Sequence, residues 1–195
     1  MIYMEAHKLG WRPLMTSYLA SLPDSFSGEQ KTLLSDLFEW LVPACLKLIK
    51  DCPLNIRYSE LHLFSSLTRI FSAVIDVRGL KENKTKVDTI TLQTVFIFSI
   101  IWGLGSTIPE GSKKKFDTFF RNLLDGLVKG RDEGAVNVSK NSSCLFAGYT
   151  KPPTFKLGRS NLFGDVGTVF EYMLSPEVAG TWCRWQDQVR ELCLL

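Results

Sequence analysis

The fold is decided by residues 90–104, which read ITLQTVFIFSIIWGL. Apolar side chains would cover nearly every side of a helix built from this run, which predicts a buried helix at the centre of a bundle. We place that helix at about residues 87–104. The run is shorter than the roughly 20 apolar residues that span a bilayer, and Thr91, Gln93 and Thr94 interrupt its first turns. A membrane-spanning segment is therefore the weaker alternative.

Two shorter helices are predicted before this run, because apolar residues recur there every three or four positions. One covers about residues 13–22, with Pro13 in its first turn, where the missing backbone N–H costs nothing. The other covers about residues 59–79. Ser59 stands at its start and is a good N-cap residue.

A longer helix is predicted between them, over about residues 27–50. Ser27 and Gln30 have the spacing of a capping box, in which each side chain binds the backbone N–H of the other residue. Pro43 falls inside the apolar pattern and should kink or restart the helix, because proline lacks the N–H that the helix needs.

A fifth helix is predicted over about residues 112–130, beginning at Ser112 and ending at Gly130. Lysines occupy its first turn at positions 113–115, which is the unfavourable end for positive charge. A solvated face is the plain interpretation of these lysines, and contact with an acidic neighbour is the alternative.

The two ends of the chain have a different texture. Met1–Glu5 predicts a short strand, and residues 131–160 predict a loop or linker, because glycine, serine, asparagine and lysine dominate there without apolar periodicity. Residues 161–195 are rich in aromatic side chains, including Trp182 and Trp185, which indicates docking. The predicted fold class is therefore mostly α, a helical bundle with a short N-terminal strand and a partly extended C-terminal segment.

The composition excludes several function classes. Of the 195 residues, 45% are hydrophobic and the net charge is only +3, which argues against nucleic acid as a partner. The five cysteines form no C-x-x-C pair, and only His7 and His62 could join them, so we expect no metal site and read the cysteines as free thiols. No signal peptide is visible at the start of the chain.

No catalytic motif is complete. Residues 103–113 approach a phosphate-binding loop, but the spacing is wrong and the segment joins two predicted helices, whereas such a loop runs from strand to helix. His7 and His62 lie far apart in sequence and lack a supporting nucleophile. We therefore predict no catalytic, cofactor-binding or metal-binding residues in this chain.

Six colinear stretches make the chain similar to axonemal dynein heavy chains of the inner-arm type. They lie at residues 1–14, 37–43, 95–102, 112–117 and 163–172, and at the spaced tryptophans 182 and 185. The chain departs from the family pattern at Ala6, Lys113 and Gly164. Lysine at 113 keeps the charge of the usual arginine but loses its planar fork.

The resemblance implies a helical AAA+ lid and extension. It assigns residues 1–22 to the end of the second module's large subdomain, 23–130 to the lid, 131–160 to a linker, and 161–195 to the truncated start of the third module. It implies a piece of a motor for microtubule-based ciliary movement, without its own ATP site, since the family's Walker motifs and arginine finger lie upstream of the position matching Met1.

The resemblance also implies partners and a cellular location for the chain. The partners would be the rest of the heavy chain, the intermediate and light chains and, indirectly, microtubules, in the cytoplasm, cytoskeleton and axoneme of a cilium. ATP would be bound by the parent motor, and no membrane or nucleic acid is expected. The residues expected to anchor packing or interfaces are all aromatic: Trp11, Trp40, Trp102, Phe116, Phe119, Phe120, Trp182 and Trp185.

Two other functions stay open at this point. A stand-alone helical scaffold or adaptor would use the region of Trp182 and Trp185 for docking. A small enzyme of unrecognised type would have only the glycine-rich turn at 103–113 and the two histidines behind it.

Overall fold

The computed structural model describes residues 10–53, 58–77, 88–126, 151–158, 162–175 and 178–193. Its helices are α2 (Arg12–Ser21), α3 (Gly28–Lys50), α4 (Glu60–Val77), α5 (Thr89–Gly103), α6 (Glu110–Leu124) and α7 (Trp185–Cys193). Strands β1 (Tyr172–Leu174) and β2 (Trp182–Arg184) form an antiparallel hairpin in which Met173 pairs with Cys183. The prediction of a mostly helical fold is confirmed.

Helix α5 lies at the centre of the bundle, as its sequence predicted. It packs against α3, α4 and β1, and its apolar residues from Leu92 to Ile101 are buried, except for the half-buried Phe98. Two of its buried hydroxyls are satisfied within the helix, since Thr94 donates to the Ile90 carbonyl and Ser99 to the Val95 carbonyl, both at 2.8 Å. Among the described residues, Thr89–Thr107 is long and apolar enough to cross a membrane, but 72% of that window is buried inside the protein.

Helices α4 and α5 approach each other closely at Gly103. A Cβ atom added at Gly103 would lie 2.7 Å from the Cα atom of Leu67 and 3.0 Å from its backbone nitrogen. The absence of a side chain at position 103 therefore allows the two backbones to meet. Such close approach is a use to which only glycine is suited.

Two predicted caps are confirmed. The Ser27 hydroxyl accepts from the Gln30 backbone N–H at 3.3 Å, and the Gln30 side chain accepts from the Ser27 N–H at 2.9 Å, completing the capping box of α3. The Ser59 hydroxyl accepts from the backbone N–H of His62 at 3.2 Å. Pro13 lies in the first turn of α2, as expected.

Of the two outcomes expected at Pro43, a restart is wrong, because α3 runs without a break from Gly28 to Lys50, while a kink stays a prediction. Proline removes one backbone hydrogen bond, but the residues around it, among them Trp40, Val42 and Cys45, are buried. Tertiary packing therefore holds the helix together across the lost bond.

The predicted limits of α6 are also wrong. The helix begins at Glu110 with Pro109 in the N-cap position, so Ser112 lies in the first turn instead of preceding it. It ends at Leu124, where Gly126 adopts a positive φ of 74°. This is the left-handed conformation that commonly terminates a helix, and it comes before Gly130.

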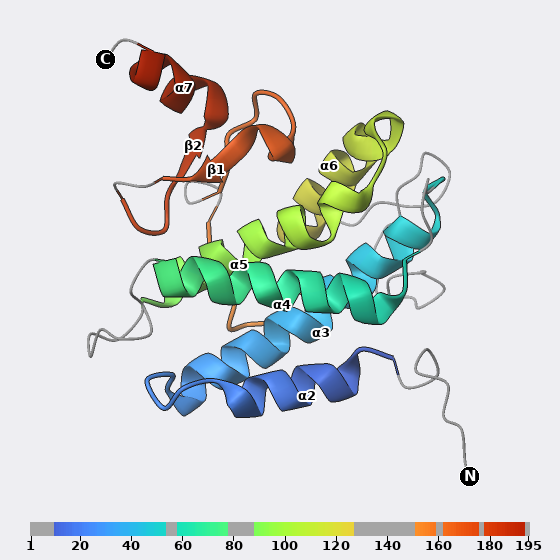
Figure 1. The fold of residues 1–195 in the computed structure, drawn as a ribbon, viewed down its shortest axis with the longest axis vertical. Helices are drawn as coiled ribbons and strands as arrows, with labels where there is room; N and C mark the ends of the chain where they lie inside the picture. Colours follow the sequence, from blue (N-terminus) through green and yellow to red (C-terminus); the bar gives the residue numbers. More distant parts are fainter. Residues whose placement is uncertain are drawn as a thin grey trace.

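The C-terminal elements lie apart from the N-terminal helix. Figure 1 shows β1, β2 and α7 gathered at one end, away from α2. Residues 151–158 form no helix or strand, but Phe155 and Leu157 are buried against the helices. The predicted strand at Met1–Glu5, His7 and the segment 131–150 lie outside the described residues.

Candidate functional site

Aromatic side chains join the helices to the C-terminal hairpin. The ring of Phe170 packs against Phe116 of α6 at 5.6 Å and against Trp102 of α5 at 6.3 Å between centroids. Trp182 of β2 meets Phe98 at 6.3 Å and Phe163 at 5.3 Å. We call this contact region, formed by α5, α6 and residues 162–185, the joint.

Polar contacts reinforce the joint from α6. The Oδ1 atom of Asp117 accepts from the backbone N–H of Val169 at 2.8 Å and from Nε of Arg121 at 2.9 Å. Arg121 donates to the carbonyl of Gly164 at 2.8 Å and to that of Gly167 at 3.3 Å. Two side chains one turn apart on α6 thus bind the backbone of the loop at three points.

A second carboxylate continues these contacts into the hairpin. Glu171 accepts from the Thr168 backbone N–H at 2.9 Å, and Arg184 of β2 donates to its other oxygen at 3.2 Å. The Thr168 N–H and the Arg184 guanidinium hold the pKa of Glu171 below its usual value. The charged form of this carboxylate is therefore the one that the folded loop favours.

The joint is also where polar groups are least satisfied among the described residues. Buried atoms without a hydrogen-bond partner there are Nε1 of Trp102, Nε1 of Trp182 and Nε of Arg184. The same end of the chain carries exposed apolar side chains, since Trp185 is 42% exposed and Val189 is 54% exposed. Buried donors normally find partners, yet unpaired buried donors and exposed apolar side chains occur together at this end of the chain.

Residues 151–158 run beside α5, and we call them the strap. The buried amide of Gln93 donates to the Thr154 carbonyl at 3.0 Å and accepts from the Lys156 backbone N–H at 3.1 Å. Phe155 packs edge-on against Trp40 of α3 at 5.0 Å between centroids. The Thr154 hydroxyl also donates to Oδ2 of Asp36 on α3 at 2.9 Å. The strap therefore links α3 to α5 through a buried amide, a hydroxyl–carboxylate hydrogen bond and an aromatic contact.

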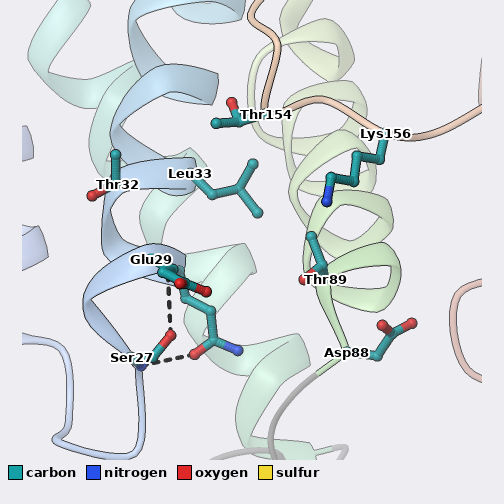
Figure 2. Close-up of a pocket in the computed structure, with 9 residues that line it drawn as sticks. Ser27, Glu29, Thr32, Leu33, Asp88, Thr89, Thr154 and Lys156 are labelled. Carbon is teal, nitrogen blue, oxygen red and sulfur yellow. Dashed lines mark hydrogen bonds between the residues drawn. The ribbon is translucent and has the colours of Figure 1, made fainter.

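A groove of about 910 Å³ lies beside the strap. Figure 2 shows Ser27 and Glu29 at the start of α3 on one side, Asp88 and Thr89 at the start of α5 on the other, and Lys156 above. Hydroxyl and mixed charged groups line it. Among the described residues there is no group of three His, Cys, Asp or Glu side chains that could hold a metal ion.

The structure places the sequence-predicted anchors in different surroundings. Trp102, Phe116, Trp182 and Trp185 meet around the joint, where Trp185 lies edge-on to Trp102 at 6.2 Å. The others are buried elsewhere in the bundle: Trp11 stacked on Phe64, Trp40 against the strap, and Phe119 and Phe120 on the inner face of α6.

Sequence reasoning missed the polar half of the joint. Asp117 and Arg121 have the i, i+4 spacing of a helical ion pair, which the sequence shows, but their loop partners are more than 40 residues away. Gln93 counted only as an interruption of an apolar run. A polar side chain at the centre of such a run was the available signal, since buried amides need partners.

The glycine-rich turn resembling a phosphate loop connects helices, as predicted. Gly103 ends α5, Gly105 begins a short 3-10 turn (Gly105–Thr107), and α6 follows. Lys113 forms an ion pair with Glu110 at 2.6 Å and lies 5.5 Å from the ring centroid of Phe170. Its side chain is thus engaged by α6 and the joint, while His62 is exposed on α4.

A mostly helical bundle with a small C-terminal β-hairpin is consistent with the class of helical lid domains found in AAA+ proteins. Comparison with known families makes this specific: residues 34–187 match the dynein heavy chain AAA lid domain. The chain belongs to this family, and the resemblance inferred from its sequence is confirmed.

Individual relatives agree. The chain is 33% identical to "Dynein axonemal heavy chain 3" of Homo sapiens and 31% identical to "Dynein axonemal heavy chain 12" of Mus musculus, with 97% of the chain covered in both cases. It is 24% identical to "Dynein-1-alpha heavy chain, flagellar inner arm I1 complex" of Chlamydomonas reinhardtii over 83% of the chain. The chain spans only 4%, 6% and 4% of these relatives respectively. No solved structure gives a significant match.

Proposed function

We propose that this chain works as the helical lid of an AAA+ module in an axonemal dynein heavy chain, coupling that module to the segment that follows it. The observation that carries the proposal is the joint, because aromatic and charged contacts fasten the loop before the hairpin, and Trp182 of the hairpin itself, to α5 and α6. A tightly packed contact transmits rigid-body displacement, since packed interfaces do not deform continuously.

In this proposal the chain carries no catalytic or cofactor-binding group of its own, and ATP is bound and hydrolysed elsewhere in the parent motor. The partners are the remainder of the heavy chain, the intermediate and light chains of the complex and, indirectly, microtubules. The location is the axoneme of a cilium or flagellum, within the cytoskeleton. The exposed Trp185 and Val189 support contact with another part of the motor.

The test uses a full heavy chain that carries the substitution Phe170→Leu within the segment corresponding to these 195 residues. The substitution removes ring contacts with Phe116 and Trp102, each worth about 0.5–1.5 kcal/mol. The matched control is Tyr58→Leu, an aromatic change at a side chain that is 38% exposed.

The measurement is the ratio of microtubule-stimulated to basal ATPase rate. We expect Phe170→Leu to lower this ratio and Tyr58→Leu to leave it unchanged. An unchanged ratio for Phe170→Leu in an assembled motor would contradict the coupling role. Saturable ATP binding by the isolated chain would contradict the assignment of ATP to other parts of the motor.

A further inference from the structure

The loop at residues 163–169 is bound by α6 mainly through backbone atoms, and one loop carboxylate, Asp165, lies 3.8 Å from Nη1 of Arg121 in an exposed ion pair. Asp117 accepts from the N–H of Val169, the first residue of the 3-10 turn Val169–Glu171, and so caps that turn. Arg121 donates to the carbonyl of Gly164 near the start of the loop and to that of Gly167 closer to its end. Both ends of the loop are therefore fixed to the same helix.

Asp117 and Arg121 act as one unit. A single oxygen, Oδ1 of Asp117, bonds both Val169 N and Arg121 Nε, so the carboxylate orients the guanidinium while it caps the turn. The two side chains are only 15% and 21% exposed, so solvent screens the pair less than it screens a surface ion pair. The guanidinium also lies 4.9 Å from the ring centroid of Phe163.

This geometry requires arginine at position 121. Its planar fork sends Nε to Asp117 while Nη1 and Nη2 reach two separate carbonyls. A lysine at the same position would keep the charge but offer a single nitrogen on a flexible stem. Side-chain volume and charge alone therefore do not reproduce the contact.

We propose that Asp117 and Arg121 form a latch that holds the 163–169 loop, and with it the β1–β2 hairpin, to α6 so that the two move together. This inference rests on the proposed coupling function, for which the two are positioning residues. From the loop the contact continues to β2 through Glu171 and Arg184. Release of the latch would loosen the 163–169 loop on α6 while leaving the bundle and the aromatic contacts of the joint in place.

The experiment is hydrogen exchange, followed by mass spectrometry, on the full 195-residue chain. The variants are Arg121→Gln, Arg121→Lys and Asp117→Asn. The matched control is Arg12→Gln, which removes a bidentate arginine–carboxylate pair with Glu39 on the far side of the bundle. Peptides covering residues 162–175 report on the loop, and peptides covering α5 report on the core.

We expect Arg121→Gln to speed exchange in residues 162–175 at least about tenfold, which corresponds to about 1.4 kcal/mol of local opening free energy. Exchange in α5 should stay at the wild-type rate. Arg121→Lys should be intermediate, and Arg12→Gln should leave the loop peptides unchanged. Asparagine keeps an Oδ1 acceptor for the Val169 N–H, and the lost charge of Asp117 matters only for orienting Arg121. Asp117→Asn combined with Arg121→Gln should therefore exchange no faster than Arg121→Gln alone.

The latch is refuted if Arg121→Gln leaves loop exchange at the wild-type rate, if Arg121→Lys restores it fully, or if α5 exchange rises as much as loop exchange. A full heavy chain carrying Arg121→Gln separates the latch from the coupling function. Loosened loop exchange with a lowered microtubule-stimulated to basal ATPase ratio supports both. Loosened exchange with an unchanged ratio supports the latch and refutes the coupling function.

Discussion

Alanine at position 103 should destabilise the chain, although alanine is the better helix former. A Cβ atom there would meet the Leu67 Cα at 2.7 Å, well inside the 3.4 Å at which ordinary contacts begin. The obstacle is backbone, so α4 and α5 must separate. Overpacking of this kind typically costs about 1–3 kcal/mol, and the propensity gain of at most about 1 kcal/mol at a helix end offsets only part of it.

The matched control is Gly111→Ala in the first turn of α6, where a Cβ atom would meet nothing within 4 Å. That change should be neutral or stabilise the chain by up to about 1 kcal/mol. Urea unfolding followed by circular dichroism measures both free energies of unfolding.

A double variant sharpens the test. Because the nearest atoms to a Cβ at position 103 are the backbone Cα and N of Leu67, truncating that side chain with Leu67→Ala should not rescue Gly103→Ala. The costs of the two changes should add, with about 2–5 kcal/mol coming from the buried leucine. Wild-type stability for Gly103→Ala, or rescue by Leu67→Ala, would refute the close backbone approach of α4 and α5.

Three further outcomes follow from individual side chains. Gln93→Leu should lower the free energy of unfolding, measured in urea, by about 2–3 kcal/mol, because it leaves two backbone groups of the strap unpaired. The control Ser99→Ala, on the same buried helix, should lower it by less than about 1 kcal/mol. Equal losses would contradict the strap contact. The folded-state pKa of Glu171 is lowered, so its contribution to stability is present above the ordinary glutamate pKa and is lost as pH falls through the folded value. Glu171→Gln should therefore flatten the acid side of the curve of unfolding free energy against pH. An unaltered curve would argue against the contact. Burial raises the pKa of the Cys45 thiol, so it should react with a thiol reagent at pH 8 only in denaturant, and fast labelling of the folded chain would contradict its placement.

Much of the bundle could be predicted from local pattern. The run around α5 is apolar on all sides, and only a central position satisfies such a helix. The capping box at Ser27 and Gln30 is a contact between neighbours in sequence, so one sequence suffices to predict it. The family resemblance added the class of domain, which periodicity alone does not define.

What could not be predicted depends on distant partners or on competition between local signals. Asp117 binds a backbone group 52 residues away and Gln93 binds one 61 residues away, and no local pattern encodes either pairing. Pro43 signals a break that burial of its neighbours overrides. Ser112 is a good capping residue, but Pro109 precedes it at a conformation that starts the helix earlier.

The most direct test of the central claim is the size of the native polypeptide that contains this sequence. An antibody raised against residues 131–159 would be used to probe a denatured lysate of ciliated or flagellated cells from the source organism. If the chain is the lid of a dynein heavy chain, the band will be far larger than the 22.1 kDa of these 195 residues. A sole band near 22.1 kDa would contradict that account and favour a stand-alone scaffold.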